Sequence, residues 1–201
     1  SLMPRAPGQV DELKSAAILQ AASDLFVEKG AGASMAEIAR RAGVSKQTLY
    51  NRFPTKTDIG RALAAQRSDA VTAPLTSGAA PEDVLTAIAE TLIGKICREG
   101  KGASLRGVAL MSPEAPELAR AIYDAGPGES VRRIAAWLSE QDRLGLLSVP
   151  DPAAAAEMFA GMVLGHGHLR AVLGLPHPET DDAPVRARET ARRFIRAFAP
   201  V

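Results

Sequence analysis

Proline and glycine recur along this 201-residue chain at intervals about as long as a helix, a spacing that favours helices over other elements. Ala and Leu dominate the segments between these residues, and alternating runs of β-branched residues are almost absent. A half-buried strand needs such alternation, whereas an amphipathic helix repeats apolar side chains every three to four residues. We therefore predict an all-α protein of about nine helices. Its hydrophobic content of 46% is enough to bury a substantial core.

Residues 38–56 have the pattern of two crossing helices joined by a tight turn. Ala39 allows the two helices to approach closely, Gly43 can adopt the left-handed conformation of the turn, and Leu49 faces the crossing. Such a helix-turn-helix places its second helix, predicted over about residues 45–52, where it can enter a DNA major groove.

Capping residues mark the helix ends in the same region. Ser34 with Glu37 fits a capping box, and Ser45 is the predicted N-cap of the second helix of the motif. Thr55 with Asp58 is predicted to cap a further helix. The first helix is predicted over about residues 11–29.

The charge of the chain is uneven. Residues 1–72 hold ten Lys or Arg and seven Asp or Glu, whereas residues 73–201 hold fourteen and sixteen. From residue 40 to residue 57 there are five cations and no acid, as expected of a surface that faces phosphates. These cations are Arg40, Arg41, Lys46, Arg52 and Lys56. A protein that coats nucleic acid without sequence preference is usually basic throughout, so the local charge favours a regulator.

Residues 73–81 are rich in Ala, Thr, Ser, Gly and Pro and are predicted to form a loop between two domains, 1–72 and 73–201. Longer helices follow, and Gly126-Pro127 is predicted to kink or end one of them. They are predicted over residues 81–97, 105–111, 116–125, 128–144, 153–173 and 183–198.

We expect a cytoplasmic protein. The single cysteine, Cys97, rules out a disulfide framework and cysteine zinc fingers, and the thiol is expected to be buried and inert. The N-terminus has no apolar run of signal-peptide length. The strongest membrane candidate, residues 153–175, contains Glu157, His166, His168 and Arg170, which are costly in lipid. It is therefore read as a buried helix, in which Gly161 and Gly165 allow close contact with another helix.

The string Ile18-x-x-Ala21-Ala22-x-x-x-Phe26-x-x-x-Gly30, followed by Ile38-Ala39-x-x-Ala42-Gly43-Val44-Ser45-x-x-x-Leu49-Tyr50-x-x-Phe53-x-x-Lys56, resembles the N-terminal domain of TetR/AcrR-type transcriptional regulators. The resemblance covers about residues 18–63. It implies a homodimer with one DNA-binding domain per subunit. It also implies a C-terminal domain that binds a small effector and dimerises through its last two long helices. Most regulators of this kind are repressors that an effector releases from a palindromic operator.

Eight residues match DNA-contacting positions of this family. Lys46, Gln47 and Thr48 lie early in the recognition helix, where side chains reach base edges. Ser34, Ser45, Tyr50 and Lys56 match positions that hold phosphates. Asn51, also a candidate, stands where an aromatic is frequent. Arg40 and Arg41 are either contacts or ordinary solubility charges.

Seven large or adaptable side chains are candidates to line an effector pocket between the middle helices, although the same pattern also fits plain core. They are Ile93, Met111, Trp137, Met158, Phe159, Met162 and His166. The effector is expected to be apolar or amphipathic. His166 and His168 point about 200° apart on a helix and have no obvious third ligand, so no metal site is expected.

Two other functions stay open. One is a helical enzyme, but the chain has no phosphate-binding glycine loop, no Gly-x-Ser-x-Gly elbow and no cluster of carboxylates with histidine, so neither catalysis nor a cofactor is predicted. The other is an architectural or protein-docking helix-turn-helix that never reads bases. This alternative would be favoured if the protein bound every DNA sequence with the same affinity, or if it bound no DNA at all.

Overall fold

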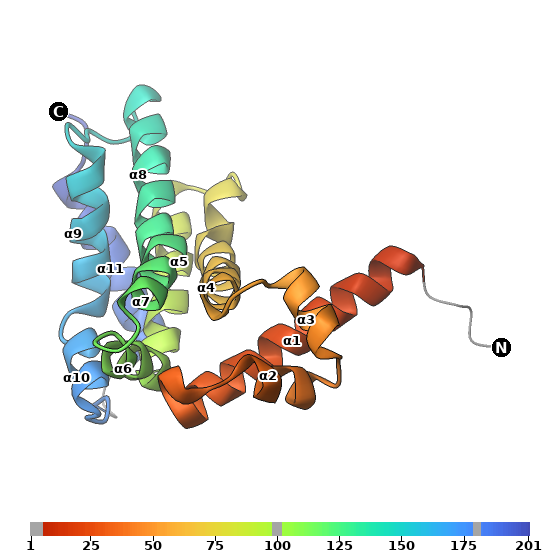
Figure 1. The fold of residues 1–201 in the computed structure, drawn as a ribbon. Coiled ribbons are helices and arrows are strands. Elements are labelled where there is room, and N and C mark those ends of the chain that lie inside the picture. The colour runs from red at the N-terminus through yellow and green to blue at the C-terminus, as the bar shows by residue number, and fades with distance from the viewer. Residues whose placement is uncertain (1–5, 98–101, 179–181) are drawn as a thin grey trace.

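The computed structural model describes residues 6–97, 102–178 and 182–201, and within these ranges it contains eleven α-helices, two short 3-10 helices (η1 and η2) and no strand (Figure 1). The elements are α1 (Pro7–Lys29), η1 (Gly30–Gly32), α2 (Met35–Ala42), α3 (Lys46–Arg52), α4 (Lys56–Thr72), η2 (Ala73–Thr76), α5 (Pro81–Cys97), α6 (Gly102–Met111), α7 (Pro116–Ala125), α8 (Pro127–Arg143), α9 (Pro152–Leu164), α10 (Gly167–Leu173) and α11 (Ala183–Ala197). The thiol of Cys97, expected to be inert, lies outside the described side chains.

The helix predicted over residues 153–173 is in fact two helices, α9 and α10. Gly165 ends α9 with a φ of 48°, a conformation that strains any residue with a side chain, and its N–H donates to the carbonyl of Gly161 at 2.8 Å. Gly161 is exposed, and no atom lies within 4 Å of a Cβ built on it. The predicted close helix contact through this glycine pair is therefore wrong within the chain, because one glycine ends the helix and the other faces outward.

The junction at Gly126 also separates two helices, α7 and α8. A Cβ on Gly126 would lie 2.9 Å from the carbonyl oxygen of Ile122 and 3.3 Å from Cβ of Ala64 on α4. Only a residue without a side chain fits this close approach. The chain therefore turns at Gly126, and α4 packs closely along α7 and α8.

The buried apolar residues form two separate clusters, which define two parts of the molecule. We call α1, α2, α3 and the first turns of α4 the head, and the remainder the body. The head core contains ten buried residues, which are Ile18, Leu19, Ala21, Ala22, Leu25, Ala33, Ile38, Ala39, Leu49 and Ile59. The body core is larger and includes Val71. Because α4 contributes Ile59 to one core and Val71 to the other, the domain boundary at residue 72 stays a prediction.

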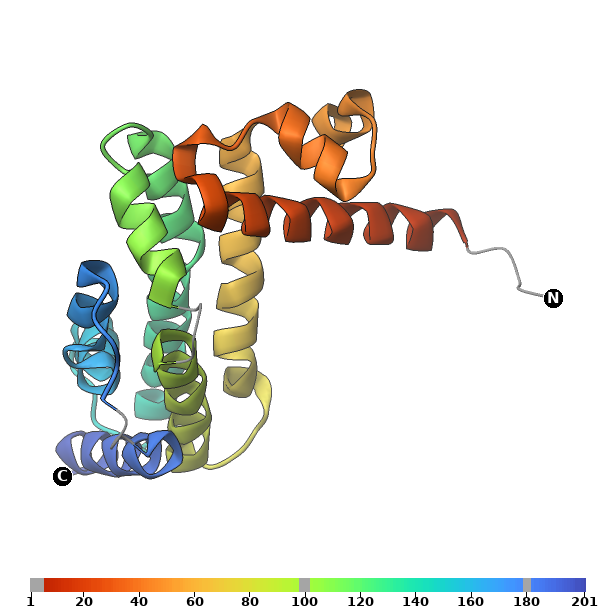
Figure 2. The ribbon, with the colours of Figure 1, turned by 90° about the horizontal axis from the view of Figure 1, so that it is seen from below.

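The head projects from one side of the body. In Figure 1 the body helices α4, α5, α7, α8 and α9 stand side by side, and α1 extends away from them past α2 and α3. The view from below shows the same arrangement, with α1 crossing one end of α4 (Figure 2). No helix in the described ranges is long and apolar enough to cross a membrane.

Candidate nucleic-acid interface

The turn between α2 and α3 has the geometry that the sequence predicts. Gly43 has a φ of 71°, in the left-handed region, and the N–H of Val44 donates to the carbonyl of Ala39 at 3.0 Å. Leu49 is fully buried in the head core and fixes the crossing of the two helices. The predicted helix-turn-helix is therefore confirmed.

Side-chain caps set the N-termini of both helices. Ser34 Oγ accepts from the N–H of Glu37 at 3.1 Å, and the Glu37 carboxylate accepts from the N–H of Ser34, as a capping box requires. Ser45 Oγ accepts from the N–H of Thr48 at 3.1 Å and donates to Oγ1 of Thr48 at 2.9 Å. Helices of eight and seven residues are marginal alone, so these caps help to hold α2 and α3 in place.

The outer side of α3 carries the predicted base-reading side chains. Lys46, Gln47, Tyr50 and Asn51 are all exposed, and none of them makes a hydrogen bond or ion pair with the described part of the chain. The donors of Lys46 and Gln47, in the first turn, are thus available to another molecule. Thr48 lies beside them, half-buried.

Three of the four other cations of the basic segment are held by the head itself, whereas Arg40 is exposed and makes no hydrogen bond or ion pair within the described residues. Arg52 donates to the carbonyl oxygen of Asp11 at 2.9 Å, to its carboxylate at 2.6 Å and to Ser15 Oγ at 3.0 Å. Arg41 makes two bonds to the Glu28 carboxylate, at 3.0 and 3.1 Å. Lys56 Nζ donates to the carbonyl of Ala31 at 2.8 Å.

The run from residue 40 to residue 57 is thus free of acids in sequence but not in space. Its acidic partners come from α1, and Asp11 is 41 positions from Arg52. No local signal indicates such pairs. The interactions of Arg52 orient the recognition helix on α1, a positioning role that the sequence reading missed.

Hydrogen bonds hold the pKa values of three head carboxylates below their usual range. For Glu37 the main cause is the hydrogen bond from Lys29, followed by that from Ser34. For Glu28 it is the bond from Arg41, and for Asp58 the bond from Thr55. These carboxylates therefore remain ionised to lower pH than free ones.

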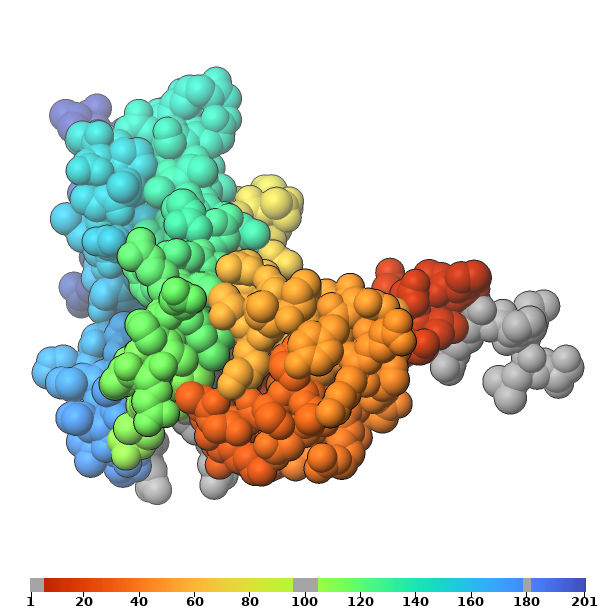
Figure 3. All heavy atoms as spheres, in the orientation of Figure 1, coloured from red at the N-terminus to blue at the C-terminus, as the bar shows by residue number. Residues whose placement is uncertain are grey.

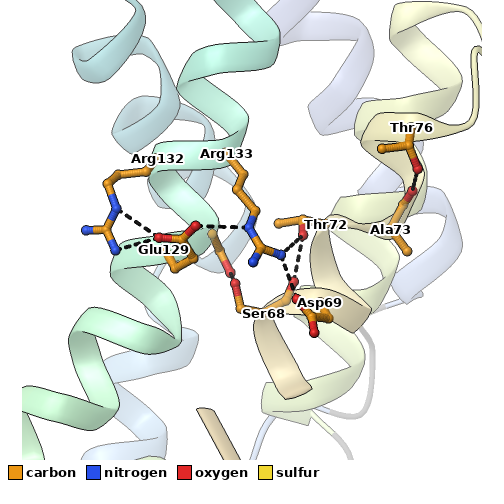
Figure 4. A network of polar contacts seen from close by, with 9 residues as sticks. Ser68, Asp69, Thr72, Ala73, Thr76, Glu129, Arg132 and Arg133 are labelled. Carbon is orange, nitrogen blue, oxygen red and sulfur yellow. Dashed lines mark hydrogen bonds and ion pairs between the residues drawn. The ribbon is translucent and has the colours of Figure 1, made fainter. Parts of the chain in front are cut away.

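A polar network ties α4 to α8 and thereby ties the head to the body (Figure 4). The hydroxyls of Ser68 and Ser130 lie 3.1 Å apart and are buried. Arg133 donates to Asp69 at 2.8 Å, to Thr72 at 3.0 Å and to Glu129 at 3.1 Å. Since α4 also contributes Ile59 to the head core, these bonds connect α8 to a helix that the head and the body share.

The seven candidate pocket residues do not converge on one described cavity. Ile93 and Phe159 are buried in the body core, and Trp137 packs partly buried against it. Met158, Met162 and His166 are exposed. Met111 lines a cavity of about 40 Å³ between α1, α4, α6 and α7. The described residues contain no group of three or more His, Cys, Asp or Glu that could hold a metal ion.

Comparison with known proteins accounts for both halves of this architecture. Residues 18–63 match the family model described as bacterial regulatory proteins, tetR family. Residues 83–200, more than half of the chain, match the model described as AefR-like transcriptional repressor, C-terminal domain. The chain belongs to the TetR family of transcriptional regulators. No curated protein matches this sequence.

Solved structures agree with the assignment. A TetR-family transcriptional regulator from Mesorhizobium loti MAFF303099 is 26% identical, with a TM-score of 0.76 over 94% of this chain and 98% of that one. The flavonoid-responsive regulator FrrA is 30% identical, with a TM-score of 0.69 over 93% of this chain and 97% of that one. A TetR regulator from Agrobacterium tumefaciens has the same fold at 22% identity, with a TM-score of 0.73 over 98% of this chain and 96% of that one.

The predicted fold class, an N-terminal helix-turn-helix domain with a C-terminal helical domain, is confirmed for this TetR-family protein. The family and the structural neighbours are transcriptional regulators. This protein is therefore a transcriptional regulator and not an enzyme. The described residues form eleven α-helices against the expected nine, and the separation of α9 from α10 accounts for one of the two additional helices.

Proposed function

We propose that this TetR-family regulator is a cytoplasmic repressor that binds a palindromic operator as a homodimer and is released by a small effector bound in the body. The observation that carries the proposal is the outer side of α3, where Lys46 and Gln47 are exposed without partners in the described chain. The C-terminal match to a transcriptional repressor domain supports the sign of the regulation.

The two residues suit different bases. A lysine can donate to O6 and N7 of guanine, and a glutamine can pair with N6 and N7 of adenine. Thr48, Tyr50 and Asn51 complete the surface that would face the major groove. Ser34, Ser45 and Lys56 would position phosphates, although each already makes bonds inside the head.

An exposed apolar surface along α9 and α10 supports the homodimer. Met158 is 57% exposed and Met162 41%, one turn apart on α9, while Leu169 and Leu173 on α10 are 54% and 57% exposed. Four large apolar side chains exposed on two consecutive helices are candidates for an interaction surface. A second copy that covers it would set the spacing of the two heads.

That spacing gives an effector its leverage. Two heads that read half-sites must lie about one DNA turn, roughly 34–36 Å, apart. An effector that binds more tightly to a conformation with a different spacing weakens operator binding. If its binding free energy differs by about 1.4 kcal/mol between the two conformations, the operator affinity can fall about tenfold. FrrA, described as flavonoid-responsive, supports a small-molecule effector for this chain too.

An electrophoretic shift assay with genomic fragments tests the proposal. We expect a saturable band that resists non-specific competitor DNA at physiological salt. Light scattering on the complex in solution should show two chains. Replacing both Lys46 and Gln47 by alanine should abolish specific binding, because each good base contact is worth about 1–3 kcal/mol.

Arg120→Ala is the matched control. Arg120 lies on α7, its side chain is 81% exposed, and its loss removes one positive charge, as Lys46→Ala does. Specific binding should persist in this variant. Affinity that is equal for all fragments would indicate an architectural protein instead, and turnover of a bound compound would indicate an enzyme; either result contradicts the proposal.

A further inference from the structure

Helix α4 is the structural connection between the head and the body. Near its start it contributes Ile59 to the head core, and near its end it contributes Val71 to the body core. Its 17 residues span about 25 Å, at a rise of about 1.5 Å per residue. The direction in which α4 runs along the body therefore determines where the head lies.

The first half of α4 meets the body through apolar contacts. A Cβ built on Gly60 would lie 2.6 Å from Cδ1 of Leu118 on α7, so the two helices approach closely there. Towards α6 the packing is incomplete, because Leu63, Phe26 and Met111 line a cavity of about 40 Å³ that is partly open to solvent. In Figure 3 the head lies against the green surface of α6 and α7. Since apolar contacts have no preferred direction, they hold α4 near the body without fixing its angle.

The second half of α4 meets α8 through bonds that do have a direction (Figure 4). Arg133 of α8 donates through Nη1 to the Asp69 carboxylate at 2.8 Å and to the Thr72 hydroxyl at 3.0 Å, both on α4. Its Nε donates to Glu129, one turn earlier on α8, at 3.1 Å. A guanidinium is planar and its donors have a fixed geometry, so bonds at Nε and Nη1 together orient it. Arg133 thus links a defined position on α8 to a defined position on α4.

The adjacent arginine, Arg132, makes no such link. It donates to the same Glu129 carboxylate at 2.6 and 3.0 Å and to the carbonyl of Asp124 on α7 at 2.8 Å. All of these partners belong to α7 and α8. Of the two arginines, Arg133 alone reaches α4 within the described chain, so Arg132 shows what an arginine on α8 contributes without that link.

We propose that Arg133 is a positioning residue for operator recognition. Its bonds to Asp69 and Thr72 fix the angle between α4 and α8 and thereby the spacing of the two heads in the dimer. The inference rests on the proposed function, to which it adds the residue that determines which half-site spacing the dimer accepts. The second head binds its half-site at an effective concentration that depends on geometry, so a fixed angle favours one spacing over others.

The polar contacts that remain without Arg133 make it a suitable residue to replace. Thr72 keeps its own bond to the carbonyl of Ser68 at 2.7 Å, and the buried hydroxyls of Ser68 and Ser130 keep each other, 3.1 Å apart. Arg133→Met therefore removes the link and leaves these buried hydroxyls with partners. Arg132→Met is the matched control, because it removes the same charge and also takes a partner from Glu129.

Double electron–electron resonance between two spin labels tests the positioning without DNA. The labels are attached in a Cys97→Ser chain that carries Arg40→Cys on α2 and Leu144→Cys at the end of α8, two exposed positions. Labelled chains are diluted in unlabelled ones, so that only distances within one chain are measured. We expect the same narrow distance distribution without a further change and with Arg132→Met. Arg133→Met should broaden or shift it.

Selection from a pool of random DNA duplexes tests the consequence for the operator. We expect the wild type and Arg132→Met to select one half-site sequence at one spacing. Arg133→Met should select that sequence over a wider range of spacings. Its affinity for the wild-type operator should fall about tenfold or more, because the second head is no longer held at its half-site. Its affinity for a duplex with a single half-site should not change, since the exposed side chains of α3 that are proposed to read bases are intact.

Asp69→Ala is a second variant, which removes one partner of Arg133 from α4 and replaces it by a good helix former. It should act in the same direction as Arg133→Met but less strongly, since Thr72 still accepts from Arg133. Combined with Arg133→Met it should add nothing, because both changes remove the same link. If Arg133→Met does not fold, Asp69→Ala decides.

The inference is overturned if Arg133→Met gives the distance distribution of Arg132→Met, or if it selects half-sites at the wild-type spacing alone. Failure of the proposed function would look different. In that case the wild type itself selects no pair of half-sites, and the distance measurement still decides whether Arg133 positions the head.

Discussion

The head and the body are held together by different kinds of interaction. The head builds two helices of only eight and seven residues around ten buried side chains, and it depends on caps and on ion pairs to α1. The body packs longer helices around a larger core that contains an aromatic cluster, in which the rings of Phe159 and Phe194 meet edge to face at 5.2 Å. The surface predicted to read DNA thus lies on the part with the smaller core, and this difference can be tested.

The largest effect is expected in the body core. Phe194 is fully buried and contacts both Phe159 and Phe198. Phe194→Ala should lower the free energy of unfolding by about 3–5 kcal/mol, because it leaves a cavity that longer helices cannot close. Urea unfolding followed by fluorescence measures it, since the single tryptophan, Trp137, belongs to the body.

Leu144→Ala serves as the control for this prediction. Leu144 is 52% exposed at the end of α8, so its truncation should change stability by about 0.5 kcal/mol or less. Similar losses for the two variants would contradict the assignment of Phe194 to the core.

The second effect is expected in the head core. Leu49→Ala should cost about 2–5 kcal/mol and should act on the head first, because the residue holds α3 against α1 and α2. Circular dichroism would then lose helical signal at a urea concentration at which Trp137 fluorescence is still native. Tyr50→Ala, the exposed neighbour on the same helix, should leave both signals unchanged. Coincident transitions in Leu49→Ala would show that head and body unfold as one unit.

The sequence predicts contacts between residues that are close in the chain, and it misses contacts between distant ones. The left-handed turn at Gly43 and the caps at Ser34, Ser45 and Thr55 were predicted correctly because both partners of each contact lie within a few residues. The ion pair of Arg52 with Asp11 was not, since its partners are 41 residues apart. Local patterns therefore define the motif but not the contacts that orient it.

The cavity that Met111 lines shows the same limit. Met111 was singled out from the sequence, but Phe26 and Arg67 were not, because the pocket was sought within residues 73–201 and the cavity lies across the head–body boundary. The break at Gly165 was also missed, since an apolar run with a glycine in it fits one helix as well as two. Which helices meet depends on packing that no local pattern encodes.

A smaller effect is expected from the cap of α2. Ser34→Ala removes the acceptor for the N–H of Glu37 and should cost about 0.5–2 kcal/mol. In urea unfolding, the loss should lower the midpoint of the circular-dichroism transition more than the midpoint of the Trp137 fluorescence transition. Ser139→Ala, in the exposed middle of α8, is the control and should be neutral or slightly stabilising, because alanine is the better helix former. A neutral Ser34→Ala would mean that tertiary contacts alone hold α2.

The smallest effect is expected from pH. The folded head lowers the pKa of Glu37 below its ordinary value of 4.5, mainly through the hydrogen bond from Lys29. A lowered carboxylate pKa stabilises the folded state above the unfolded value, and this stabilisation is lost as the pH falls through the folded value. Glu37→Gln should therefore reduce the difference between the urea midpoints at pH 7 and pH 3.5. Glu90→Gln on α5, whose carboxylate makes no ion pair within the described chain, should leave that difference intact. If both variants reduce the difference between the two midpoints equally, the loss of stability in acid reflects the overall charge of the protein and not the ionisation of Glu37.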